Sequence, residues 1–534
     1  MRTILSAYHL QDCDQADRNL QSMAGEPHER LQLAEILPTL MEAVARTANP
    51  DQALTHWDRL LEGIARSSLF AYVGRSPRIL NLLCTIFGNS DALAFTVIRD
   101  PMLVYWLAEE GVLTKVPTRK GMEEAARKAV GRMRRKDMKL EALRRVRRRE
   151  MLRIGVRDLL HVADVPETTA ALSDLAGALI HAAYKIVDAD LRKHYGVPMH
   201  KNGQGEWTKT GFAVIGMGKL GGHELNYSSD VDLIYVYASD AGETRPPKVG
   251  GRTQPGAVGT SNEEYFEILS RDLTKALAEH TQEGHIFRVD LRLRAEGTVG
   301  QLARSLDDYT KYYDTRGAVW ERLALLKAWP VAGSREVGKT FVKMVRPFVL
   351  GRSEEQVDFV HALGIVRDVR DVKDRIDTKI AGRRQERRNV KLGIGGIREI
   401  EFLVQTIQVI AGNRLAGLID RNTIGSLNRC VHYKLISKQK RDELTNAYLF
   451  LRDVEHKLQM VDDLQTHTLP ESGEELERCA IRAGYGMNEH AHPAERFRAD
   501  HQRHTETVNQ CFRSLFNEPE SSPLLQAILT ARPS

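Results

Sequence analysis

The sequence has few cysteines and no long apolar run, and each shortage excludes a class of protein. Its five cysteines lie far apart and form no CxxC pair: Cys13, Cys84, Cys430, Cys479 and Cys511. This spacing argues against a zinc ribbon or a disulfide framework and fits a reducing compartment. No 18 apolar residues run together, and the N-terminus lacks the apolar centre of a signal peptide. We therefore expect a cytoplasmic protein with no membrane partner.

Net charge is also small, at +6 over 534 residues, so global basicity decides little about partners. A hydrophobic content of 42% with 28% charged residues is that of an ordinary soluble protein. The length predicts about three domains. Helical spacing of apolar residues predicts helical regions at 1–205 and 341–534, with a mixed α/β segment at 206–340 after a loop at Lys201–Lys209. The predicted fold class is α+β, mostly helical, with a small mixed sheet between the helical parts.

Two helices of the first region carry specific expectations. Leu31–Ala48 has helical periodicity with an expected break at Pro38. A helix over Thr168–Arg192 contains Asp188 and Asp190. Because residues i and i+2 do not face each other on a helix, we expect these two acids at the surface and not in a cluster.

The most charged segment runs from Arg127 to Arg157, with fourteen Lys or Arg residues against three acids. Its RRxRRR run raises the possibility of nucleic-acid binding. However, the segment has no interleaved aromatics, and it carries an apolar stripe of Leu140, Leu143, Val146, Met151 and Ile154. We therefore expect a packed helix that is solvated, paired with acids, or directed at an acidic protein partner or nucleotide phosphates, and no nucleic acid.

A glycine-rich turn follows the apolar run Phe212–Ile215, with glycines at positions 216, 218, 221 and 222. It matches the G-x-G-x-x-G pattern of dinucleotide-binding folds. The distance from Gly221 to Asp230 is too short for the crossover helix that such a parallel βαβ unit requires. A Walker A motif is excluded because Lys219 precedes Leu220 and not Ser or Thr.

Asp230 and Asp232 open a second apolar run, Val231–Ala238. In a strand, residues i and i+2 point to the same face, so both carboxylates project together beside the glycine-rich turn. A strand predicted over His285–Arg294 places Asp290 on its polar face. Three carboxylates of this kind suit a two-Mg²⁺ site for nucleotidyl transfer, since Mg²⁺ prefers carboxylate oxygens. An ion pair with a neighbouring arginine is the alternative role of Asp290.

At this point the chain closely resembles the glutamine synthetase adenylyltransferase/adenylyl-removing enzyme family, within the polymerase-β-like nucleotidyltransferases. Five blocks in one order carry the resemblance: GMGKLGGHELNYSSDVDLIYVY (216–237), FRVDLRLR (287–294), YYDTRGAVWERLALLKAWPVAG (312–333), KLGIGGIREIEFLVQ (391–405) and LRDVEHKLQMVDDLQTHTLP (451–470). The resemblance makes 206–340 a nucleotidyltransferase catalytic domain and 341–534 a helical bundle domain.

The family usually has two homologous halves, which attach AMP to and remove it from a tyrosine of glutamine synthetase. This chain carries one Ser-Ser-Asp-x-Asp motif, and its wording resembles the N-terminal, adenylyl-removing half. The resemblance therefore implies phosphorolysis, in which phosphate attacks the AMP–tyrosine bond and ADP is released. ATP-dependent adenylylation of glutamine synthetase stays open. So does a non-catalytic half that docks glutamine synthetase or a PII signal protein.

By resemblance, Asp230, Asp232 and Asp290 would be the catalytic metal ligands. The positions implied near nucleotide or phosphate are Gly221, Gly222, Ser229, Lys219, Arg292, Arg294 and Lys327. A salt bridge to Glu321 or a neighbour explains Lys327 equally well. From the second domain, Arg398, Glu399 and Glu401 would face the site or form an ion-pair network.

The chain departs from the family pattern in two blocks. After DLRLR it has Ala295 and Glu296 where the family has Pro-Phe, and in the Gly-x-Gly-Gly turn it has Ile394 where the family has Arg. We expect Ala295 to loosen the end of the strand and Ile394 to remove a cation near the phosphate site.

The C-terminal part contains a group of histidines: His490, His492, His501 and His504. The spacing could suggest a metal site. We expect instead that a helix displays these side chains to solvent.

Overall fold

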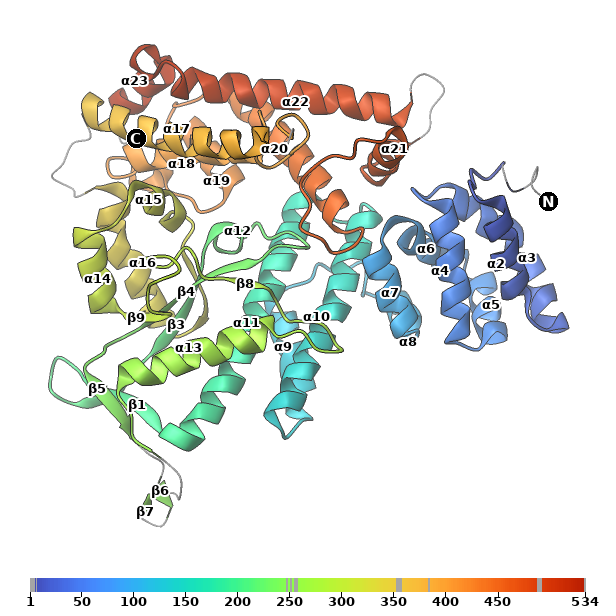
Figure 1. Ribbon diagram of the computed structural model, residues 1–534, viewed down its shortest axis with the longest axis horizontal. Coiled ribbons are helices and arrows are strands. Elements are labelled where there is room, and N and C mark those ends of the chain that lie inside the picture. Colours follow the sequence, from blue (N-terminus) through green and yellow to red (C-terminus); the bar gives the residue numbers. More distant parts are fainter. Residues whose placement is uncertain are drawn as a thin grey trace.

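The computed structural model describes residues 5, 7–245, 248–249, 252–253, 258–351, 358–382, 385–486 and 492–532. Figure 1 shows helices α2–α8 at one end of the molecule, the sheets in the middle, and long C-terminal helices such as α22 along one edge. The mostly helical α+β class predicted from the sequence is confirmed.

Helices α2 to α8 form the described N-terminal end. They are α2 Cys13–Ala24, α3 Pro27–Ala45, α4 Pro50–Glu62, α5 Arg66–Arg75, α6 Pro77–Asn89, α7 Asp91–Arg99 and α8 Met102–Ala108. Several begin at a side-chain cap, as where Asn49 accepts from the backbone N–H of Gln52 at the start of α4. The expected break at Pro38 is wrong, because α3 continues through it while burying Ile36 and Leu40.

The basic segment is divided between α9 Arg119–Gly131 and α10 Lys136–Leu159, which pack against α11 Val165–Tyr195. Helix α11 is apolar enough to qualify as a membrane span by length and hydropathy, but 67% of that window is buried inside the protein. The expectation of a surface Asp188 is wrong. Its carboxylate is buried and accepts from the Tyr265 hydroxyl at 2.9 Å.

Most of the RRxRRR run serves internal contacts. Arg144 is buried and donates to the Glu279 carbonyl at 3.1 Å, and Arg148 pairs with Glu283. Arg147 lies 3.7 Å from an Asp463 carboxylate oxygen. Of the alternatives for this helix face, pairing with acids therefore describes the whole RRxRRR run.

The central sheet has the order β10-β3-β4-β8, with β9 also paired to β4. Its strands are β3 Phe212–Gly216, β4 Val231–Tyr237, β8 Val289–Asp290, β9 Ala303–Ser305 and β10 Trp329–Gly333. Strands β3 and β4 are antiparallel, whereas β8 and β9 run parallel to β4. Antiparallel pairing across the glycine-rich turn excludes a dinucleotide-binding βαβ unit.

The strand expected over His285–Arg294 is much shorter, because only β8 pairs. Asp290 Oδ1 accepts from the backbone N–H of Arg292 at 2.8 Å, and this local bond turns the chain away from the sheet. The residues expected to form a loop at Lys201–Lys209 include the ends of a hairpin. Here β1 Val197–Lys201 pairs with β2 Trp207–Lys209 and with β5 Gly242–Arg245.

The remaining elements are mostly helices. They are β6 Lys248–Val249, β7 Arg252–Thr253, α13 Asn262–Ala278, α14 Leu306–Thr315, α15 Val319–Leu325, α16 Arg335–Leu350, α17 Phe359–Ala381, α18 Ile397–Ala411, η1 Ala416–Leu418, α19 Thr423–His432, α20 Lys438–Gln459, α21 Gly473–Arg482, α22 Pro493–Phe516, η2 Pro519–Ser521 and α23 Pro523–Thr530.

The central sheet separates two hydrophobic cores. In β3, Phe212 and Val214 belong to the core shared with α2–α11 and α13, whereas Ala213 and Ile215 belong to the core shared with the later helices. This division follows from the two-residue period of a strand. Each half of the protein therefore uses one face of the same sheet as part of its interior.

Candidate active site

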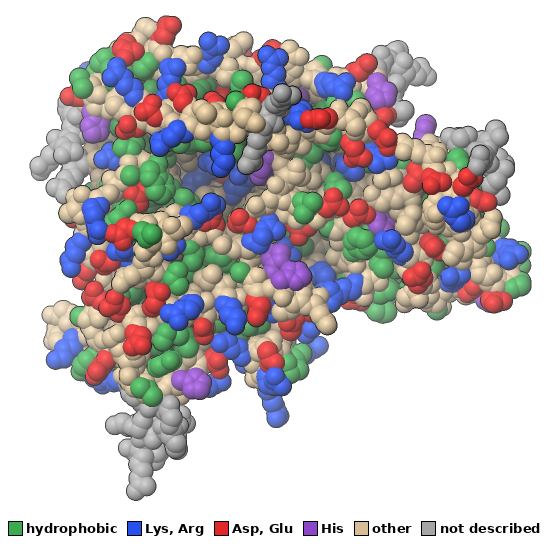
Figure 2. Space-filling model, viewed as in Figure 1, with side chains coloured by type: hydrophobic (Ala, Val, Ile, Leu, Met, Phe, Trp, Pro, Cys, Tyr) green, Lys and Arg blue, Asp and Glu red, His purple; other side chains and the backbone are tan. Residues whose placement is uncertain are grey.

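A cavity of about 590 Å³ lies where the glycine-rich turn, the starts of β4 and β8, α15, α18 and the segment after α20 meet. Figure 2 shows Lys and Arg side chains gathered in a recess below the band of C-terminal helices. Its polar lining is Lys219, Ser228, Ser229, Asp230, Asp232, Asp290, Arg292, Lys327, Lys391, Arg398, Glu401, Gln405, Gln465 and His467.

Three carboxylates meet at one edge of the sheet. Asp230 directly precedes β4 and Asp232 lies within it, so both project from the same face. Parallel pairing places Asp290 of β8 in register with Asp232. The juxtaposition expected from the sequence is thus present in the structure, with two of the acids held by arginines. Arg288 Nε lies 2.8 Å from Asp230 Oδ1, and Arg292 Nε lies 2.9 Å from Asp290 Oδ2.

The acids differ in proton affinity. Burial, followed by the nearby charge of Asp290, raises the pKa of Asp232 to about 6. At Asp290 burial also favours the neutral form, but the hydrogen bonds from Arg292 outweigh burial and lower the pKa. Of these two acids, Asp232 is therefore the one whose charged form is destabilised in the folded protein.

The glycine-rich turn fits against this acid without space for side chains. Its short helix α12 spans Gly218–Gly221, and Gly218 has φ +50°. A Cβ at Gly218 would lie 2.5 Å from Asp232 Oδ2, and one at Gly221 would lie 2.0 Å from the Lys327 carbonyl oxygen. Glycine is therefore required for close approach at both positions.

Ion pairs form the opposite wall of the cavity. Lys327 is buried, with its Nζ 2.7 Å from Glu224 and 3.0 Å from Glu401. Burial opposes the charge of Lys327, but the two carboxylates outweigh it and raise the pKa. Lys219 Nζ lies 2.8 Å from Glu455. Lys327 thus makes a salt bridge, although with these two acids and not with Glu321.

Several residues implied by the resemblance lie outside the cavity lining. Arg294 is buried and donates to the carbonyls of Leu291, Thr298 and Gly300, so it holds its own loop together. Glu399 lies 3.1 Å from Lys373 Nζ, away from the cavity. Gly221 and Gly222 shape the turn behind it. Ser229, Lys219, Arg292, Lys327, Arg398 and Glu401 do line it.

Sequence reasoning missed Lys391 and His467, which line the cavity from distant segments. His467 Nδ1 lies 2.9 Å from Glu455, the acid that also holds Lys219. Lys391 is half-buried, and its pKa is lowered chiefly by desolvation. The glycine turn that follows Lys391 was the available signal, since such a turn brings a backbone close to a site.

The residues that depart from the family pattern, Ala295, Glu296 and Ile394, lie outside the lining of the carboxylate cavity. Ala295 is buried, and Glu296 is bound by Arg304 and Arg316. Ile394 is 47% exposed and lines another cavity, so the cation missing at this position is not missing from the carboxylate site.

The fit of Mg²⁺ can be judged from the donor set. Among the described residues, no three His, Cys, Asp or Glu side chains are close enough together to hold a metal as they stand. Yet the three carboxylates supply the oxygen ligands that Mg²⁺ prefers. A cation would also stabilise the charged form of Asp232, whose pKa is raised by burial and by the charge of Asp290. The residue types therefore fit Mg²⁺, and Asp290 is bound by Arg292 in this structure.

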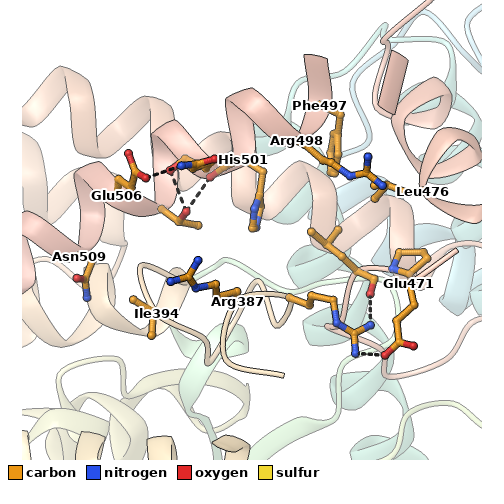
Figure 3. A pocket seen from close by; sticks show the side chains of 14 residues that line it. Arg387, Ile394, Glu471, Leu476, Phe497, Arg498, His501, Glu506 and Asn509 are labelled. Atoms are coloured by element: carbon orange, nitrogen blue, oxygen red, sulfur yellow. Dashed lines mark hydrogen bonds and ion pairs between the residues drawn. The ribbon is translucent and has the colours of Figure 1, made fainter. Parts of the chain in front are cut away.

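A neighbouring cavity of about 580 Å³ lies between the 385–396 turn and α22, and Figure 3 shows Arg387 and His501 directed toward it. A backbone partition separates it from the carboxylate cavity. Val390 N–H donates to the His467 carbonyl at 2.8 Å, and Leu469 N–H donates to that of Arg388 at 2.9 Å.

The histidines near this second cavity are not displayed to solvent as a group. Burial lowers the pKa of His501 to about 4, and His504 packs on the Phe450 ring. His492 pairs with Glu477. His490 lies outside the described residues.

Comparison with known proteins places these features in context. Residues 80–344 match the family described as glutamate-ammonia ligase adenylyltransferase, and residues 370–516 match the GlnD PII-uridylyltransferase family. The chain is 38% identical over 439 residues to the bifunctional glutamine synthetase adenylyltransferase/adenylyl-removing enzyme of Thioalkalivibrio sulfidiphilus, covering 82% of this chain and 42% of the relative. The enzyme of the same description from Nitrosococcus oceani is 36% identical, covering 83% and 43%. The chain thus spans less than half the length of these relatives.

Proposed function

The chain belongs to the glutamine synthetase adenylyltransferase/adenylyl-removing enzyme family, and from this premise we propose that it removes AMP from the adenylylated tyrosine of glutamine synthetase. The proposed reaction is Mg²⁺-dependent phosphorolysis, which converts adenylyl-tyrosine and phosphate into tyrosine and ADP. The observation that carries this proposal is the set of three carboxylates at one edge of a cavity that is also lined by lysine and arginine side chains. The proposed direction of the reaction, removal of AMP, rests on the resemblance of the motif sequences to the N-terminal, adenylyl-removing half of the family.

The cavity has two chemically different ends. Its apolar lining comprises Leu293, Trp320, Leu323, Ala324, Val372, Ile376 and Phe402. A flat, largely apolar adenine base suits this end, whereas phosphates suit the end with the carboxylates and cations. We therefore propose that AMP lies across the cavity, with its phosphorus near Asp230, Asp232 and Asp290.

The chain's own residues can position both phosphorus groups. Arg398 and Lys391 present positive charge for the attacking phosphate, and Arg292 can exchange its bond with Asp290 for a phosphate oxygen, with Ser229 nearby. Asp230, Asp232 and Asp290 would hold Mg²⁺, which when bound neutralises charge on the transferring group. As the phosphate oxygen bonds to the AMP phosphorus, the tyrosine oxygen leaves and takes up a proton.

Direct assay separates the candidate activities. Incubation with adenylylated glutamine synthetase, Mg²⁺ and phosphate should release ADP and restore synthetase activity. Transfer of AMP from ATP onto unmodified glutamine synthetase, without ADP release in the first assay, would instead establish the forward reaction. Activity in neither assay would favour a docking half for glutamine synthetase or a PII signal protein.

Mg²⁺ binding should depend on pH through Asp232. Because the pKa of this carboxyl is about 6, the metal must displace a proton below that pH. The apparent Mg²⁺ affinity should therefore fall by up to about tenfold per unit as pH decreases below 6. Calorimetry in two buffers of different ionisation enthalpy should detect proton release near pH 6. Asp232→Asn should abolish this release, and its persistence in that variant would contradict the assignment.

The proposed location is the cytoplasm. Cys84, Cys430, Cys479 and Cys511 are buried and form no disulfide. Such thiols suit a reducing compartment.

A further inference from the structure

We propose that a groove between α9, α10 and α11 docks an acidic, amphipathic helix of a protein partner. The groove has a volume of about 740 Å³ and lies apart from the carboxylate cavity. Figure 1 shows these three helices side by side next to the central sheet.

The rim of the groove has a surplus of positive charge. It carries the cations Lys120, Arg127, Arg134, Lys136, Lys139, Lys185 and Lys193, against the acids Glu123, Glu124 and Asp190. These acids already have partners, since Glu123 binds Arg119, Glu124 binds Arg127 and Lys128, and Asp190 binds Lys136 and Lys193.

Four of the cations are left for a partner. Within the described chain, no carboxylate lies within ion-pair distance of Lys120, Arg134, Lys139 or Lys185. Lys120, Lys139 and Lys185 come from α9, α10 and α11, and Arg134 comes from the turn between α9 and α10, so these cations surround the groove. Several acidic side chains on one face of a partner would meet them together, and such charge complementarity also accelerates association.

The apolar floor of the groove favours a helical partner over an extended acidic chain. It is lined by Ala126, Val130, Ala178, Ala182, Ile186 and Ala189. Small residues let another helix backbone approach closely, and an apolar stripe on that helix would cover the floor. An occupant with acids on its flanks and small apolar residues along its centre matches both rim and floor.

The same features disfavour nucleic acid. The described groove lining contains no Phe, Tyr or Trp on which bases could stack, and arginines of the RRxRRR run are used inside the protein. The cations that remain are mostly lysines around an apolar floor. Phosphates would leave that floor uncovered.

Hydrogen bonds link α11, which lines the groove, to the segment that follows the glycine-rich turn and to β10. Upstream in α11, Ser173 Oγ accepts from the Leu225 backbone at 3.0 Å, and Asp174 binds His223 at 3.0 Å. On β10, the Gly333 N–H donates to His181 Nδ1 at 3.3 Å, and His181 lines the groove. A docked helix would therefore contact elements that support the active site.

The test uses the full chain and a designed peptide probe. The peptide is a capped helix with glutamates flanking an alanine and leucine stripe, and a scrambled peptide of equal composition is its control. Fluorescence anisotropy should show saturable binding of the ordered peptide, weakened by salt and at least tenfold tighter than the scrambled one. Equal binding of both peptides, or no binding, would overturn the proposal.

Two groove variants locate the binding. Lys139→Glu/Lys185→Glu should weaken the peptide at least tenfold, and Ala182→Phe should do so without changing charge. Lys339→Glu/Lys343→Glu on α16 is the charge-matched control and should bind normally, with circular dichroism verifying that all three variants fold. Unchanged binding to both groove variants, or tighter binding of single-stranded RNA than of the peptide, would refute the docking site.

Discussion

Replacing Asp230 and Asp232 together by asparagine should lower kcat for ADP release at least about a thousandfold. Both carboxylates stand at the sheet edge beside Asp290, and asparagine keeps their shape while removing the charge that binds Mg²⁺. Initial rates with adenylylated glutamine synthetase and saturating phosphate measure the effect. KM should change much less, because the cationic walls and the apolar end of the cavity remain.

The matched control is Asp307→Asn, which neutralises an exposed acid on α14 and should retain full activity. A double variant that still turned over at a tenth of the normal rate would remove these residues from the catalytic role.

Folding can be verified separately with Asp232→Asn. Because the folded-state pKa of Asp232 is raised to about 6, its carboxylate destabilises the metal-free protein as pH increases from about 4 to 6. At pH 7 the single variant should be stabilised by up to about 3 kcal/mol.

Lys327→Met should lower the free energy of unfolding by about 3–5 kcal/mol. The change removes the cation that lies between the buried carboxylates of Glu224 and Glu401, and of the two only Glu401 keeps an ion pair within the described chain, with Arg398. Thermal denaturation at neutral pH measures the loss. Activity should fall as well, because the backbone of Lys327 packs against Gly221 of the glycine-rich turn.

A second substitution distinguishes charge from packing. Adding Glu401→Gln to Lys327→Met removes one of the two neighbouring negative charges and should recover part of the lost stability. Lys339→Met on the exposed face of α16 should change stability by no more than about 0.5 kcal/mol. If Lys327→Met melts at the wild-type temperature, the buried ion-pair network does not stabilise this cavity.

The part of the site that was predictable lies in local sequence. Asp230 and Asp232 share a face because a strand has a period of two, and the short gap after Gly221 excluded a crossover helix. Asp290 could be placed on a polar face, but only the parallel register of β8 against β4 shows which acid it adjoins. Pairing between distant strands is not encoded in either strand alone.

The remainder depends on tertiary contacts. Lys391 and His467 reach the cavity because two distant backbone segments pair at Val390. Arg294 has the same residue type as Arg292 two positions earlier, yet the turn after Asp290 directs it into its own loop. The basic residues of α10 look alike in sequence. In the structure, Arg145 and Arg148 pair with Glu283 of another segment, whereas Lys136 and Lys139 line the groove.

The sheet shared by two cores has a consequence for the order of folding. Strand β3 exposes one apolar face until β10 and the later helices are available, although its other face can already pack on the N-terminal helices. Closing the long chain segment between β3 and β10 costs conformational entropy before their contacts form. During synthesis the nascent chain must therefore pass through a state with half of the sheet uncovered, and this state is the stage most exposed to aggregation and chaperone binding.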